Sequence, residues 1–291
     1  MLKYISVILL LFFATTILAQ VQDSLNRKRL YYSLASDAVI ITGAYVGLNE
    51  LWYKDYEQSN LHWFNDCDEW SFMDKLGHSF ASYHVSSIYT AQMLWSGLNA
   101  NKSAIIGSGL GFITISTIEL LDAKSEEWGA SVCDLTANFL GSTFYLSQQL
   151  VWQEERISFK YSFHQTEFPQ YRPDLLGESF AQQLLKDYNG QTYWLSTNIR
   201  SFVNISWWPK YVNIAIGYGA TGMLGGKSNP SELPFYNREQ QYYLSLDIDL
   251  NRIPVKSKFL KTIFSVINIV KIPMPTLELR SGKIYGHYLY F

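Results

Sequence analysis

The sequence predicts an α+β protein, in which an N-terminal bundle of about four helices is followed by an antiparallel β-rich region. Apolar residues recur with the period of an α-helix as far as Trp152, and from Ile157 onward they alternate with polar residues. Turn-forming segments rich in glycine, proline and asparagine separate the alternating runs. We therefore expect three parts: a signal peptide at 1–19, the helical bundle at 20–152, and a β-rich region at 153–291 that packs on the bundle or inserts into a membrane.

The first residues have the layout of a secretory signal. Lys3 precedes an apolar run from Ile5 to Leu18 that ends near Ala19, where we expect cleavage. No cysteine follows that point, so we expect no lipid anchor there. The alternative is an uncleaved anchor helix, although the run is shorter than the ~20 residues that cross a bilayer.

Composition excludes one class of partner and favours another. The formal net charge is −2, and the lysines and arginines are scattered, so nothing indicates nucleic-acid binding. Charged and aromatic residues each make up 16 % of the chain, with 9 Trp and 21 Tyr. Such rings collect at membrane interfaces, so membrane lipid is the expected partner. An aromatic-rich soluble core is the alternative.

Periodicity and capping residues predict the helices. Ser71 and Ser131 each precede an aspartate by three residues, Asp74 and Asp134, which is an N-terminal capping arrangement. The stretch 104–118 is the most membrane-like in the mature chain, and its glycines favour close helix contact. The expected helices are 25–53, 71–97, 102–123 and 131–152, with an aromatic-packed loop at 54–70 and a turn at 99–101.

The second and fourth predicted helices resemble each other at an offset of sixty residues. His78 corresponds to Asn138 and Ser82 to Ser142. A remnant of duplication explains this likeness, and so do two unrelated helices that obey the same capping rule.

Alternation predicts about six strands after residue 152. Ile157 to Phe163 shows the period of two of a strand with one buried face. The other expected strands are 192–204, 211–223, 241–251 and a final pair within 276–291, with a short helix at 179–188 and an amphipathic helix at 256–270. A chain that ends on alternating aromatics resembles an outer-membrane barrel strand, but such barrels need at least eight strands. A sheet that packs on the helices or lies on the membrane is therefore the simpler interpretation.

Polar residues at helical spacing make up the candidate site. Each of three pairs shares one helix face: Asp74 with His78, Glu119 with Asp122, and Asp134 with Asn138. Histidine and carboxylates on facing helices can hold a divalent metal ion, and a histidine beside a carboxylate can act as a general base. No known metal motif is present and the sequence requires no cofactor, so the identity of any metal stays open. No Gly-x-Ser-x-Gly motif is present, which argues against an acyl-enzyme.

The same residues have a structural interpretation. Asp74 and Asp134 stand where a carboxylate stabilises the start of a helix, and His78 and Asn138 can fix helix register. Glu119 and Asp122 stand at the end of an apolar helix, where negative charge is unfavourable, so they need a partner. We therefore take His78, Glu119 and Asp122 as catalytic candidates and Asp74, Lys75, Asp134 and Asn138 as binding candidates.

The two cysteines, Cys67 and Cys133, lie next to these polar residues. An even number in an exported chain permits one disulfide between the starts of two helices. Two buried free thiols are the alternative.

The set Asp74-Lys75-x-x-His78, Glu119-x-x-Asp122 and Asp134-x-x-x-Asn138-x-x-Gly141 resembles the YfiM-like family of periplasmic or envelope proteins. It is more distantly similar to VanZ-like membrane proteins. The resemblance covers about 70–142, and the ending resembles a longer subgroup with a β-rich extension. The family implies an envelope location without an assigned activity.

These observations predict an exported protein of the periplasm or outer membrane of a Gram-negative-type envelope. A membrane-associated structural or binding role is the first hypothesis. A hydrolase or transferase that acts on a lipid or cell-wall precursor through a His/carboxylate site is the second.

Overall fold

The computed structural model describes residues 25–50, 57–126 and 128–290. The predicted signal peptide and the predicted end of the first helix lie outside the described residues. The chain divides into two compact units, which are treated separately below. Unit 1 comprises Met1–Asn65 with His78–Glu155, and unit 2 comprises Asp66–Gly77 with Arg156–Phe291. Helices in the N-terminal part and strands in the C-terminal part make the protein α+β, as predicted.

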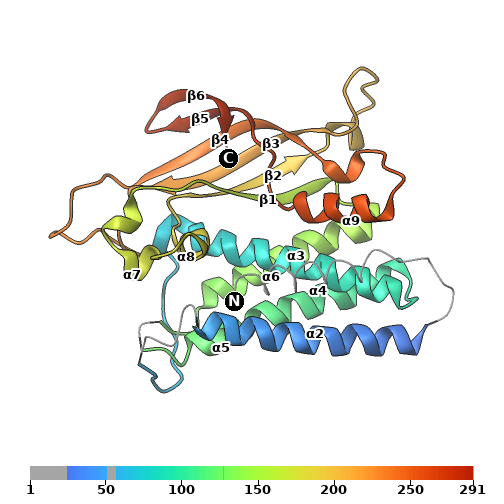
Figure 1. Cartoon of the computed structure of the whole chain (residues 1–291), viewed down its shortest axis with the longest axis horizontal. Helices are drawn as coiled ribbons and strands as arrows, with labels where there is room; N and C mark the ends of the chain where they lie inside the picture. The colour runs from blue at the N-terminus through green and yellow to red at the C-terminus, as the bar shows by residue number, and fades with distance from the viewer. Residues whose placement is uncertain (1–24, 51–56, 127, 291) are drawn as a thin grey trace. The chain divides into compact units, whose positions relative to one another are not determined.

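Unit 1 is helical (Figure 1). Its helices are α2 (Arg27–Leu48), most of α3 (Met73–Trp95), α4 (Ala100–Ser116), α5 (Ile118–Asp122) and α6 (Val132–Trp152). Ser131 is the N-cap of α6, as predicted, because its side chain accepts a hydrogen bond from the Asp134 amide. The predicted third helix is instead two helices, because α4 ends at Ser116 and Thr117 separates it from the short helix α5.

The predicted cap at Ser71 is wrong. A 3-10 turn, η2 (Glu69–Phe72), precedes α3, and Ser71 has a φ of 51°, in the left-handed region instead of the extended conformation of an N-cap. The Ser71 carbonyl accepts a hydrogen bond from the Tyr218 hydroxyl at 2.8 Å, within unit 2. Ser71 therefore makes a tertiary contact with Tyr218 instead of the local capping hydrogen bond that the sequence predicted.

Small residues bring the helices of unit 1 close together. A Cβ on Gly107 would lie 2.4 Å from the Thr90 amide nitrogen, and a Cβ on Gly111 would lie 2.7 Å from the Ser86 amide nitrogen. The approach of α6 to α3 is as close, since a Cβ on Gly141 would lie 2.0 Å from the carbonyl oxygen of Ser79. These contacts join α4 and α6 to α3 at backbone distance.

Unit 2 contains one six-stranded antiparallel sheet in which the strands follow chain order (Figure 1). The strands are β1 (Ile157–Phe163), β2 (Gln191–Thr197), β3 (Val212–Thr221), β4 (Glu239–Ile248), β5 (Met274–Arg280) and β6 (Lys283–Tyr290). The predicted number of strands is confirmed, although β2 ends seven positions before the predicted end at 204. Between strands lie η3 (Phe168–Gln170), α7 (Pro173–Leu176), α8 (Phe180–Lys186), η4 (Ile199–Ser201), η5 (Leu250–Arg252) and α9 (Lys258–Ile267).

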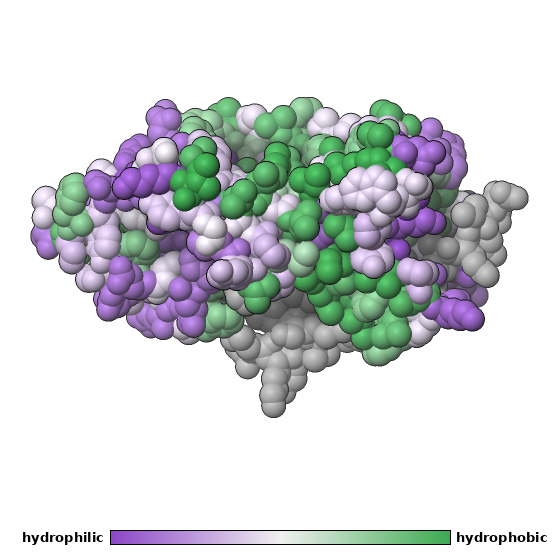
Figure 2. All heavy atoms as spheres, turned by 90° about the horizontal axis from the view of Figure 1, so that it is seen from above, coloured by the Kyte–Doolittle hydropathy of each residue, from purple (hydrophilic) through white to green (hydrophobic). Residues whose placement is uncertain are grey.

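The sheet buries polar residues on one face and exposes apolar residues on the other, which is the reverse of the usual pattern of a soluble protein. On β4 the buried residues include Gln241, Ser245 and Asp247, whereas the alternating Leu244 and Leu246 are exposed. The same alternation continues on β5, where Thr276 and Glu278 are buried and Leu277 and Leu279 are exposed. Figure 2 shows green apolar side chains gathered on the face turned to the viewer.

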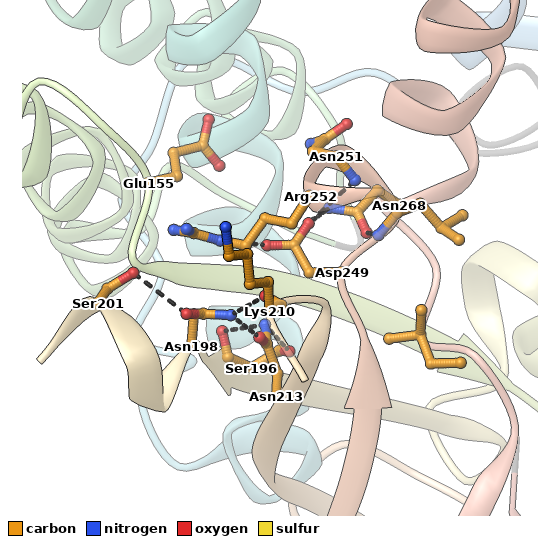
Figure 3. A network of polar contacts seen from close by, with 12 residues as sticks. Glu155, Ser196, Asn198, Ser201, Lys210, Asn213, Asp249, Asn251, Arg252 and Asn268 are labelled. Carbon is orange, nitrogen blue, oxygen red and sulfur yellow. Dashed lines mark hydrogen bonds and ion pairs between the residues drawn. The ribbon is translucent and has the colours of Figure 1, made fainter. Parts of the chain in front are cut away.

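Hydrogen bonds and ion pairs satisfy the buried polar face. Lys160 and Asp247, both with fully buried side chains, form an ion pair at 2.7 Å. Asn213 donates to Ser196 at 3.0 Å and accepts from Asn198 at 2.8 Å (Figure 3). An aromatic cluster lies among these groups: Trp194, Tyr243 and Tyr290. Because buried polar groups need partners, this face forms the interior of unit 2.

Neither cysteine is free. Cys67 and Cys133 are both disulfide-bonded.

Candidate functional site

The side chain of His78 is surrounded by three polar side chains of unit 1. Its Nδ1 lies 3.1 Å from Oδ1 of Asn138 and 3.7 Å from Oε1 of Glu119. Its Nε2 lies 3.9 Å from Oδ1 of Asp134. Helices α3, α5 and α6 thus bring together four of the residues predicted from the sequence.

Glu119 reaches this cluster because α5 is separate from α4. Its Oε2 accepts a hydrogen bond from the backbone amide of Ser131, the N-cap of α6, at 3.0 Å. The first amides of a helix have no partner within the helix and carry partial positive charge, so a carboxylate is favourable there. Glu119, whose position in the sequence placed it at the unfavourable end of an apolar helix, therefore stabilises the start of α6.

Burial dominates the electrostatics of Glu119. Its side chain is 3 % exposed, and burial raises the pKa of its carboxyl group to about 8. The charge of His78 and the Ser131 amide lower this pKa, while Asp134 and Asp122 raise it. At neutral pH, Glu119 is therefore mostly a neutral acid that can donate a proton.

Among the described residues, one of the two carboxyl oxygens of Glu119 has no hydrogen-bond partner. Within the described residues, Oε1 of Glu119 is buried and accepts none, although it lies near His78 Nδ1. The Nδ1 atom is the donor toward Asn138, because Asn138 presents its carbonyl oxygen while its amide nitrogen points at Ser116 Oγ at 3.5 Å. A buried acid with an unsatisfied oxygen beside a histidine is an arrangement that can move a proton.

A ladder of polar contacts continues from His78 along α3 and α6. Ser79 donates to the carbonyl of Ala137 at 2.8 Å, and the hydroxyls of Ser82 and Ser142 lie 2.6 Å apart. Since His78 pairs with Asn138 and Ser82 with Ser142, both pairs span sixty residues and the two helices run parallel in register. The offset seen in the sequence thus corresponds to direct contacts.

The remaining predicted residues take other positions. Asp122, the last residue of α5, is partly buried, and its charge raises the pKa of Glu119. Asp74 and Lys75 belong to unit 2 and have partners there. Asp74 accepts from the Tyr188 hydroxyl at 2.7 Å, and Lys75 pairs with Asp74 and with Asp66, both at 2.8 Å.

The cluster contains side chains of the kinds that bind a divalent cation such as Zn²⁺. However, Glu119 lies near Nδ1 of His78 and Asp134 lies near Nε2, and one ion binds only one nitrogen of an imidazole ring. Within unit 1, His78 through Nε2 and Asp134 would therefore be the ligands of such an ion, without Glu119.

Sequence reasoning missed a second polar region, in unit 2. An open pocket of about 570 Å³ is lined by residues that include His164, Tyr236 and Arg280. Burial lowers the pKa of His164. No spacing in the sequence marks this pocket, because its walls come from four separate loops and strands.

Residues 61–149 match the model of a family described as predicted periplasmic lipoprotein (DUF2279). The match covers the whole His78 cluster. No curated protein and no solved structure matches the chain. The protein is accordingly an exported protein of the periplasm or envelope, in agreement with the location predicted from the sequence.

Proposed function

We propose that this exported envelope protein is membrane-associated and has a structural or binding role. The observation that carries the structural role is the ladder between α3 and α6, in which His78 meets Asn138 and Ser82 meets Ser142. Paired polar groups in an apolar helical unit specify one register, because any slip leaves them unsatisfied. The similarity of the motif to YfiM-like and VanZ-like proteins supports an envelope role of this kind.

Two features support membrane association. Within the described residues, one helical stretch, Ala100–Asp122, is long and apolar enough to cross a membrane, by length and composition alone. Only 33 % of its most apolar window is buried, and Ile105, Ile106 and Ile113 are exposed. Recovery of the protein in the soluble periplasmic fraction without detergent would contradict this association.

A double-mutant cycle tests the ladder. Ser82→Ala and Ser142→Ala each remove one partner of a buried hydrogen bond, so each should cost about 1–3 kcal/mol of unfolding free energy. The double variant should lose less than the sum of the two, because the second substitution removes a group that has already lost this hydrogen bond. Strictly additive losses would show that the pair does not couple the helices.

The buried, protonated Glu119 beside His78 favours a second candidate function, a hydrolase or transferase that acts on a lipid or cell-wall precursor. In this mechanism Glu119 would donate a proton and Nε2 of His78 would act as the base, with the hydrogen bond from Nδ1 to Asn138 orienting the ring. A divalent ion held by His78 and Asp134 would supply an activated water.

Turnover and metal content test this candidate. The purified protein would be incubated with fluorescent phospholipids and with a lipid-linked cell-wall precursor, and products would be separated by chromatography. His78→Asn and Glu119→Gln should abolish turnover while folding normally. Elemental analysis should show stoichiometric metal if an ion is required. Absence of turnover with both substrate classes would leave the structural role alone.

A further inference from the structure

The exposed face of the sheet in unit 2 is apolar over four neighbouring strands. Ile216 on β3 is 57 % exposed, Leu244 on β4 51 %, Leu277 on β5 53 % and Ile284 on β6 73 %. We call this surface the outer sheet face and define it by six residues: Ile216, Leu244, Leu246, Leu277, Leu279 and Ile284. Large exposed apolar patches on exported proteins mark surfaces that meet a partner or a membrane.

Strand register makes this surface continuous. Ile216 pairs with Leu244 and Leu244 with Leu277, so three large side chains form a row across β3, β4 and β5. A second row follows, in which Tyr218 pairs with Tyr242, Tyr242 with Leu279, and Leu279 with Ile284. Tyrosines thus border the aliphatic row at one end of the strands, as aromatic rings do at membrane interfaces.

The opposite face of the sheet cannot be the one that is exposed, because its charged groups are buried and paired. Lys160 and Asp247 are fully buried there, and Glu278 contacts His287 at 2.7 Å. Ser196, Asn198 and Asn213 are also joined by hydrogen bonds (Figure 3). Polar inside and apolar outside is the reverse of a soluble sheet and is the pattern of strands that face lipid.

Helix α9 supplies charge at the other end of the strands, because it connects β4 to β5. Its exposed residues include Lys258, Phe259 and Lys261, and Phe259 is 71 % exposed. The whole segment 250–277 contains no aspartate or glutamate, although the chain as a whole has 25 acidic and 23 basic residues. A basic amphipathic helix with exposed aromatic and aliphatic side chains is typical of segments that lie in an anionic lipid interface.

We propose that the outer sheet face and α9 form a membrane-contact surface that lies against a bilayer containing anionic lipid. This inference rests on the proposed membrane association and identifies the surface responsible. Charge complementarity favours lipid over a second copy of the chain, because a second copy would bring another acid-free, basic segment, whereas anionic headgroups neutralise the lysines of α9.

Vesicle flotation with the purified mature chain tests the proposal. Vesicles of phosphatidylethanolamine with phosphatidylglycerol would be compared with vesicles of phosphatidylcholine alone. The test variant is Leu244→Gln/Leu277→Gln, which leaves the buried polar face unchanged. Its matched control is Leu185→Gln, because Leu185 on α8 is 49 % exposed and lies outside the surface. A second pair compares Lys258→Gln/Lys261→Gln with Lys28→Gln/Lys102→Gln, which removes two exposed lysines of unit 1.

The wild type and both controls should float with anionic vesicles. The double leucine variant should partition at least about tenfold less, since each leucine that enters the apolar phase contributes about that factor. The α9 lysine variant should lose its preference for anionic over neutral vesicles.

Three results would overturn the proposal. If the leucine variant floats like the wild type, lipid meets another surface, although the membrane association itself stands. If the wild type floats with neither vesicle type, the membrane association fails as well. If the wild type forms a dimer by sedimentation that Leu244→Gln/Leu277→Gln dissociates, and does not float, then the outer sheet face is an interface between copies.

Discussion

The substitution Glu119→Gln should change how stability depends on pH. Glutamine keeps the shape of the side chain and can still accept from the Ser131 amide, but it cannot ionise. Glu119 has a pKa of about 8 in the folded protein against a reference value of 4.5. Between these values the folded chain binds a proton that the unfolded chain has released, so stability falls as pH rises through this window.

The magnitude follows from the two pKa values. The difference between the folded and unfolded pKa values of Glu119 corresponds to a loss of roughly 5 kcal/mol of unfolding free energy once the carboxyl group is ionised in both states. Relaxation and water entry around the ionised carboxylate reduce this amount, so we expect a change of at least ~2 kcal/mol. The stabilisation relative to the glutamine variant should be fully present below pH 4.5 and lost above about pH 8.

Urea denaturation of both proteins in mild detergent, at intervals from pH 5 to pH 9, measures this difference. The free energy of unfolding of the wild type minus that of Glu119→Gln should decrease steadily across the range. Glu178→Gln removes an exposed carboxylate of unit 2 and provides the control. A wild-type minus Glu119→Gln difference that stays constant from pH 5 to pH 9 would refute the argument that burial keeps Glu119 protonated.

Two further substitutions test packing and buried charge. Gly111→Ala should lower the free energy of unfolding by several kcal/mol, because the new Cβ would collide with the backbone of Ser86. Gly109→Ala lies on the same helix with open space around it and should raise the free energy of unfolding by about 1 kcal/mol. Equal effects of the two substitutions would contradict the close approach of α4 to α3. Lys160→Met should cost about 3–5 kcal/mol because it removes the ion pair of the buried Asp247. The double variant Lys160→Met/Asp247→Asn should recover part of that loss, and a full loss in the double variant would disprove this explanation.

Local patterns in the sequence were sufficient for most elements. The cap at Ser131 depends on a side chain and an amide three residues apart, so the sequence predicts it correctly. Ser71 has the same spacing to an acidic residue, yet a hydrogen bond from Tyr218, far along the chain, accompanies a left-handed turn at that position. Capping rules cannot anticipate such a contact, because they consider only neighbours in the sequence.

In the candidate site, too, the sequence identifies the residues but not all of their contacts. The residue types and their helical spacing identified His78, Glu119, Asp134 and Asn138, but could not distinguish which carboxylates meet the histidine. The break at Thr117 decides that Glu119 turns toward the start of α6, while Asp122 ends the short helix. The helical periodicity of the sequence continues across Thr117, so it does not show this break.

Composition and spacing along the chain were sufficient to predict the α+β class, most of the helices, the six strands, the location in the envelope and the polar residues of the site. The tertiary structure was needed to show that the offset of sixty residues corresponds to contacts between α3 and α6, and that the apolar side of the sheet faces outward. Alternation shows that a strand has two different faces, but which face is covered depends on groups brought from distant parts of the chain, such as Lys160 and Asp247.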